Sequence, residues 1–149
     1  MSLNYEFYIG AEPEQVWAAL VSPEGTRQTF FGCVIRSTFR EGDAFEYIGP
    51  GKDGEATVHV YGTILACVPN QMLSYIEHPG PSYYANHAEL ESRVTFTLEQ
   101  TGGCTKLKLV NDRFSDNHPS YGNAEKHWWM ILSHIKTWVE TGKSLDFGW

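Results

Sequence analysis

Cysteine and basic residues are scarce in this sequence, which argues against a disulfide-rich protein and a nucleic-acid-binding protein. The three cysteines, Cys33, Cys67 and Cys104, are odd in number, widely spaced and in no CxxC pair. Neither a disulfide framework nor a zinc knuckle is therefore predicted, and we expect core thiols. Lys and Arg number 11 against 18 Asp and Glu, for a formal net charge of -7. This charge repels nucleic-acid phosphate and anionic lipid headgroups, so neither is expected as a partner.

Long apolar runs are also missing. No stretch of about eighteen apolar residues occurs, and the opening MSLNYEFYIG lacks the basic and apolar segments of a signal peptide. Membrane insertion and secretion are not predicted, so the cytoplasm is the expected location. The length of 149 residues and the hydrophobic content of 42% predict a single domain over residues 1–149.

Hydrophobic periodicity predicts an α+β protein. Residues 4–9 have strand-like content, and two short helices are predicted within 11–25 and 23–32, where Pro13 suits a first helical turn. From about residue 33 to 112 the period changes to two, and turn sequences separate six strand-length segments. Consecutive strands joined by short turns form antiparallel meanders, so we expect a seven-stranded antiparallel sheet.

A long helix is predicted over about 120–142, with Gly142 as its C-cap. Its apolar residues fall within a sector roughly 120° wide, the width of a core-facing stripe; they are Trp128, Ile131, Leu132, Ile135, Trp138 and Val139. His127 and His134 flank this stripe, and we expect partly exposed positions for both, with a polar contact to a ligand as the alternative. They lie roughly 10.5 Å apart along the axis, too far to share a metal ion directly.

Several segments together resemble one known family over nearly the whole chain. The matching segments, in order, are PEQVWAALVSPEG, FREGDAFEY, VYGTILACVPNQMLSY, ESRVTFTLEQTGGCTKLKLV and WWMILSHIKTWVETG. They resemble the activator of heat-shock-protein-90 ATPase homologue-like family, within the SRPBCC or START-like superfamily. That family usually has Trp-Phe where this chain has Phe30 and Phe31, and Gly where it has His127. Because both departures fall near the expected cavity, the resemblance implies no ligand preference.

The resemblance implies the helix-grip fold of the birch-pollen allergen, in which a curved sheet wraps around the long helix and leaves an apolar cavity. A solid core is the alternative. We expect the cavity to be bordered by Trp17, Phe30, Tyr47, Tyr61, Tyr75, Phe96, Trp128 and Leu132, with His59, Tyr84 and His134 as polar contacts. Tyr83 and Tyr84 lie in the longest loop, where they would either form the rim of an entrance or cover the sheet edge.

Motifs for catalysis are weak. GPGKDG at 49–54 matches G-x-G-x-x-G but contains Pro50 and joins two strands, so a hairpin is predicted. No G-x-S-x-G or Cys-His pairing is identifiable, and no metal or cofactor is predicted. Glu89 and Glu91 would share a strand face as paired acids do, although solubility is the ordinary reason for such charges.

Three functions stay open. The superfamily implies binding of a hydrophobic or aromatic ligand, such as a lipid, sterol-like or polyketide-like compound, and we prefer this hypothesis. The family name implies a module that acts on a chaperone, but members with that activity carry an additional N-terminal domain, and a single domain is expected here. A cyclase, aromatase or hydrolase that uses the same cavity is the third.

Overall fold

The computed structural model describes residues 1–147, and its elements follow the predicted order. A short 3-10 turn before β6 is the only addition within that range. The elements are β1 (Leu3–Ile9), α1 (Pro13–Val21), α2 (Pro23–Thr29), β2 (Val34–Ser37), β3 (Ala44–Pro50), β4 (Ala56–Val68), β5 (Met72–Pro79), η1 (His87–Glu89), β6 (Ser92–Thr101), β7 (Cys104–Asp112) and α3 (Tyr121–Thr141).

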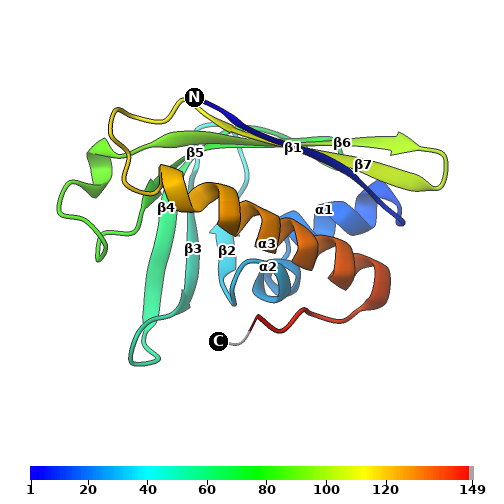
Figure 1. The fold of residues 1–149 in the computed structure, drawn as a ribbon, viewed down its shortest axis with the longest axis horizontal. Helices are drawn as coiled ribbons and strands as arrows, with labels where there is room; N and C mark the ends of the chain where they lie inside the picture. Colours follow the sequence, from blue (N-terminus) through cyan, green and yellow to red (C-terminus); the bar gives the residue numbers. More distant parts are fainter. Residues whose placement is uncertain (148–149) are drawn as a thin grey trace.

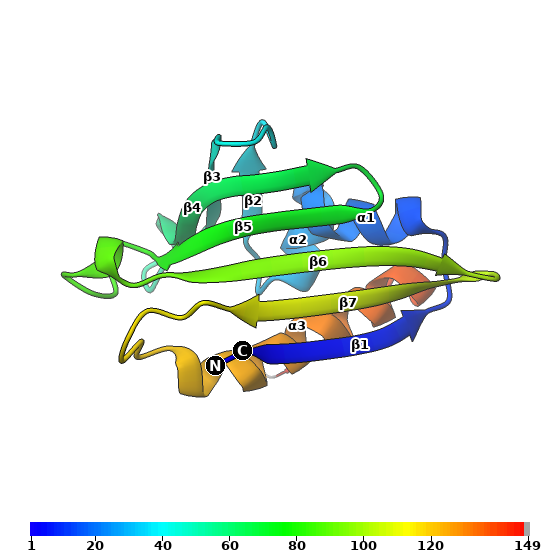
Figure 2. The same ribbon diagram turned by 90° about the horizontal axis from the view of Figure 1, so that it is seen from above.

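The seven strands form one antiparallel sheet in the order β1-β7-β6-β5-β4-β3-β2. Strands β2 to β7 are therefore a meander, and β1 pairs with β7 at one edge (Figure 2). The sheet curves so that α3 lies along its concave side, with α1 and α2 beside the helix (Figure 1). This arrangement is the helix-grip fold, which confirms the predicted fold class and strand number.

The buried stripe of α3 holds the helix against the sheet. Trp128, Ile131, Leu132 and Ile135 are buried in the shared core, whereas Trp138 and Val139 are partly buried against it. Full burial of such side chains stabilises the fold by about 1.5 to 3 kcal/mol each. The helix ends as predicted, because Gly142 adopts a φ of 76° that favours glycine. No helix within residues 1–147 is both long and apolar enough to cross a membrane.

Helix α1 closes one end of the grip. Pro13 occupies its first turn, and the Gln15 side chain accepts a hydrogen bond from the Glu12 N–H at 3.1 Å. This pairing satisfies a backbone donor that the helix itself leaves free. Val16 and Leu20 then face inward and are buried, and α1 contacts α3, β6 and β7. The closed end is thus a packed aliphatic core.

Candidate functional site

A cavity of about 670 Å³ lies at the other end of the grip, between the first half of α3 and the concave side of β3, β4 and β5. Its floor is buried and its rim is exposed. The wall is formed by Phe30, Phe31, Cys33, Tyr47, Pro50, His59, Val60, Tyr75, Glu77, His78, Pro79, Tyr83, Tyr84, His118, Ser120, Asn123, Ala124, His127, Trp128 and Ile131. A volume of this size suits a small organic molecule, since ligand pockets range over roughly 300–1,000 Å³.

Aromatic rings build the floor. The Phe30 ring stacks on the Tyr47 ring with centroids 5.2 Å apart. The hydroxyls of Tyr47 and Tyr75 share a hydrogen bond of 3.0 Å, although β4 separates their strands in the sheet. Burial raises the pKa of both phenols, and the negative charge of Glu77 adds to the rise. Both tyrosines are therefore neutral hydrogen-bonding groups at physiological pH.

Glu77 is the acid of the cavity wall. It follows Leu73 and Tyr75 on the concave side of β5, where its register partners are Gly62 on β4 and Ser92 on β6. Protein surrounds the side chain, yet part of its surface stays open to the cavity. Burial raises the pKa of Glu77 to about 7, and a hydrogen bond from Ser92 opposes the rise only partly. Near neutral pH the carboxyl therefore exchanges between its protonated and ionised forms.

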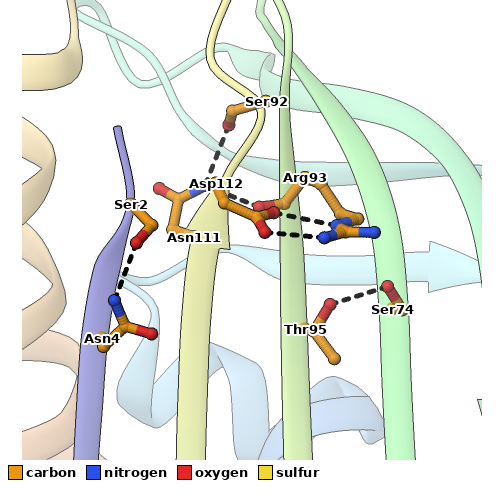
Figure 3. A network of polar contacts seen from close by, with 8 residues as sticks. All are labelled: Ser2, Asn4, Ser74, Ser92, Arg93, Thr95, Asn111 and Asp112. Carbon is orange, nitrogen blue, oxygen red and sulfur yellow. Dashed lines mark hydrogen bonds and ion pairs between the residues drawn. The ribbon is translucent and has the colours of Figure 1, made fainter.

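A chain of hydrogen bonds connects Glu77 to α3. The Trp128 indole N–H donates to Asn111 Oδ1 at 3.0 Å. Asn111 Nδ2 donates to Ser92 Oγ at 3.0 Å, a contact drawn across β6 and β7 in Figure 3. Ser92 Oγ in turn donates to Glu77 Oε1 at 3.4 Å. Because Asn111 is buried, this chain fixes the indole that forms the cavity roof and keeps the polar groups beneath it paired.

The rim is tied to the sheet by a histidine. Strand β4 carries an extra residue, His59, where the pairing with β3 shifts between Tyr47 and Ile48. A bulge of this kind re-aims a side chain. His59 Nε2 lies 3.1 Å from the Pro50 carbonyl, which only accepts, so Nε2 carries the proton and Nδ1 accepts from the Tyr83 hydroxyl. The long loop is thereby attached over the cavity mouth.

The structure brings six of the eleven predicted site residues into the cavity wall: Phe30, Tyr47, His59, Tyr75, Tyr84 and Trp128. Tyr83, the other tyrosine of the long loop, lies in the wall as well. A ligand contact for each of these residues stays a prediction.

Two of the other five lie away from the cavity because of strand and helix geometry. Val60 is the register partner of Tyr47 and faces the cavity, so its neighbour Tyr61 faces the outer side of the sheet. There its ring stacks on His78 with centroids 5.0 Å apart. Trp17 is partly buried on α1, at the closed end of the grip.

Two further residues lie behind the wall. Phe96 is fully buried and packs edge-on against the Trp128 ring, with ring centroids 5.9 Å apart, but it is not part of the wall. Leu132 is one residue beyond Ile131 on α3 and packs into the core.

The exposure of one of the two histidines of α3 differs from the prediction. His127 is exposed at the cavity rim, but His134 is only 6% exposed instead of partly exposed. The segment after α3 covers it, because His134 Nε2 donates to the Leu145 carbonyl at 2.8 Å and its ring meets Phe147. His134 Nδ1 has no hydrogen-bond partner within residues 1–147.

Glu77 is the residue that the sequence reasoning missed, although a signal was present. In LSYIE the residues Leu73, Tyr75 and Glu77 alternate, so an acid occupies a position with the same orientation as two core residues. The acids considered instead lie elsewhere: Glu89 is exposed in η1, and Glu91 precedes β6.

Both departures from the family pattern also line the cavity. Phe31 contacts His127, with ring centroids 5.8 Å apart, and Phe30 forms part of the floor.

The chemistry of the wall favours binding over nucleophilic attack. Burial raises the pKa of the Cys33 thiol to about 11, so the reactive thiolate is scarce at neutral pH. No group of three His, Cys, Asp or Glu side chains within the described residues is arranged to hold a metal ion. The absence of metal and cofactor stays a prediction.

Comparison with known proteins agrees with this geometry. Residues 10–140 match the family described as "Activator of Hsp90 ATPase homolog 1-like protein". The chain belongs to this family. No protein in a search of curated proteins matches it.

Several solved structures share this fold over nearly the whole length of the chain. A protein from Mesorhizobium loti is 24% identical over 97% of this chain and all of its own, with a TM-score of 0.75. The Aha1 dimer from Colwellia psychrerythraea is 17% identical over 97% of this chain and 99% of its own, with a TM-score of 0.71. A protein of the dynemicin biosynthetic locus is 16% identical over 96% of this chain but 48% of its own, with a TM-score of 0.72. Identities this low show a shared fold alone.

Proposed function

We propose that the protein binds a small hydrophobic or aromatic molecule, of lipid, sterol-like or polyketide-like character, in the cavity between the sheet and α3. The observation that carries the proposal is the cavity itself, about 670 Å³ with an aromatic floor and polar groups near its mouth. Apolar burial supplies affinity in such sites, and a few polar groups orient the ligand.

The wall divides these roles among its residues. Phe30 and Trp128 offer ring surface to a ligand, and the Tyr47–Tyr75 hydroxyl pair offers a polar point at the floor. His59 and Tyr84 are the expected polar contacts near the mouth.

A fluorescence titration tests the proposal. N-phenyl-1-naphthylamine is a neutral aromatic probe, and fatty acids, sterols and polycyclic aromatics would compete with it. We expect a Kd below about 100 μM for the best ligand, equivalent to roughly -5.5 kcal/mol. Ala124→Trp should fill the cavity from α3 and weaken binding about tenfold or more. Ser133→Trp, at an exposed position on the same helix outside the wall, is the matched control. Equal binding by both variants, or none by the wild type, would contradict the proposal.

Action on a chaperone is the second candidate, favoured by the family description and by exposed aromatic side chains outside the cavity. Trp129 on α3 is 53% exposed and Tyr8 on β1 is 51% exposed. Exposed aromatics are enriched among residues that dominate protein interfaces. A chaperone ATPase assay with the purified protein tests this, with Trp129→Ala expected to lose any stimulation. The cytoplasmic location stays a prediction.

A further inference from the structure

Among the described residues, the cavity wall holds one carboxylate and no lysine or arginine. Glu77 is that carboxylate. Enclosed charges are normally paired with an opposite charge, because desolvation of an isolated ion is costly. The three ion pairs found within the described residues all leave Glu77 out. No lysine or arginine within the described residues therefore pairs with this carboxylate.

The carboxyl also keeps unused hydrogen-bonding capacity. Its one side-chain hydrogen bond within residues 1–147 is the long contact of 3.4 Å from Ser92 Oγ to Oε1. An ionised carboxylate accepts at about four lone-pair sites. Since part of the Glu77 surface is open to the cavity, the remaining sites are available to a ligand.

The surroundings favour a positive group beside this acid. Tyr47, Tyr75, Phe30 and Trp128 present aromatic rings in the same wall, and ring faces attract cations. The formal net charge of the protein is -7, which adds a weak long-range attraction for cations. A fatty acid or other anion would instead bring a second negative charge close to Glu77.

We propose that the ligand is a hydrophobic or aromatic amine, whose ammonium group pairs with the Glu77 carboxylate while its apolar part occupies the aromatic floor. This inference rests on the proposed binding function. It specifies that the ligand is positively charged, which the cavity volume alone does not.

Affinity for a permanent cation should rise with pH. Burial raises the pKa of Glu77 to about 7, so the ionised fraction increases roughly tenfold between pH 6 and pH 8. Four histidines of the wall would repel a cation when protonated, in the same direction as the Glu77 effect. They are His59 on β4, His118 before α3, His127 on α3, and His78 on β5, whose ring lies on the outer side of the sheet against Tyr61. The other titratable groups of the wall are phenols and one thiol, which carry no positive charge in any form; they are Tyr47 on β3, Tyr75 on β5, Tyr83 and Tyr84 in the long loop, and Cys33 before β2.

Three probes with one ring system and different charges test the proposal. They are (2-naphthylmethyl)trimethylammonium, its carbon isostere 2-neopentylnaphthalene, and the anion 2-naphthylacetate. Each is titrated by competition at pH 6 and pH 8 against wild type, Glu77→Gln and Glu125→Gln. Glu125 is exposed on α3 outside the wall and serves as the matched control for the loss of one charge.

We expect the cation to bind wild type at pH 8 about tenfold or more tightly than its neutral isostere, and to lose roughly tenfold in affinity at pH 6. Glu77→Gln should remove the preference for the cation and should leave only the pH dependence that the histidines cause. Glu125→Gln should keep both the preference and the full pH dependence. If the neutral isostere binds as tightly as the cation, the amine inference is overturned and the cavity proposal still stands. Stronger binding of the anion overturns it as well. Absence of binding by all three overturns both proposals. The comparison of the three probes on wild type tests the amine inference even if Glu77→Gln fails to fold.

Discussion

The two ends of the grip hold the same helix against the same sheet in different ways. At the closed end, Val16, Leu20, Leu107 and Ile135 interlock and are fully or almost fully buried. At the open end, the first half of α3 faces aromatic and polar residues across a cavity of about 670 Å³. Aliphatic side chains fill space between curved surfaces at high density. At the open end, aromatic rings instead border unfilled space, and their hydroxyl and indole groups are hydrogen-bonded, so this end offers a binding surface.

The largest expected effect is in the packed core behind the cavity wall. Leu132→Ala should lower the free energy of unfolding by about 2 to 5 kcal/mol, through lost burial and the cavity left behind. Chemical denaturation measures the change. Tyr83→Ala at the exposed rim is the comparison, with an expected loss under about 1 kcal/mol. Equal losses at the two positions would contradict the distinction between a packed core and an open rim.

Glu77 should make stability fall with pH. Its pKa of about 7 in the folded protein lies above the unfolded value near 4.5. The folded state therefore holds a proton that the unfolded state releases, and this contribution to stability is lost as pH rises through about 7.

The free energy of unfolding of Glu77→Gln should match that of wild type near pH 4 and exceed it at pH 8 by on the order of 3 kcal/mol. The pKa rises from 4.5 to about 7 on folding, and one pKa unit corresponds to about 1.4 kcal/mol. Urea unfolding at several pH values measures this, with Glu89→Gln on exposed η1 as control. A wild-type curve parallel to that of Glu77→Gln would show that the folded protein does not retain the proton.

Asn111 connects β6 to α3 at the open end and should have an intermediate effect. Asn111→Ala removes the acceptor of the buried Trp128 indole and a donor to Ser92. An unsatisfied buried donor costs about 1 to 3 kcal/mol. Thermal denaturation measures the loss, and Ser74→Ala, in the part-buried pair with Thr95, should cost less. A neutral Asn111→Ala would mean that the hydrogen-bond chain does not hold the indole.

The smallest expected effect lies on the outer side of the sheet. Arg93 donates twice to Asp112, at 2.8 Å and 2.6 Å (Figure 3), but both side chains keep contact with solvent. Surface ion pairs contribute about 0 to 1 kcal/mol, and the bidentate, part-buried geometry places this pair at the upper end of that range. Arg93→Ala should therefore shift stability by no more than this amount and leave probe binding unchanged. A large loss of binding would mean that the outer face influences the cavity.

The fold was predictable from the sequence because its signals are local. Alternation over 92–101 and a helical stripe over 128–139 each specify a buried face without knowledge of the rest of the chain. The cavity depended on register and on one bulge, which local patterns do not contain. Tyr61 was misplaced because one residue of register reverses a face, and His134 because the segment that covers it follows the helix.

The most direct test of an open end and a closed end is a map of where a ligand acts. Amide proton–nitrogen NMR spectra recorded during titration with N-phenyl-1-naphthylamine report on both ends at once. The account predicts shifts concentrated at residues 47–60, 75–84 and 118–131, with Val16, Leu107 and Ile135 little changed. Shifts confined to the closed end or the outer face of the sheet, or no shifts at saturating probe, would contradict it.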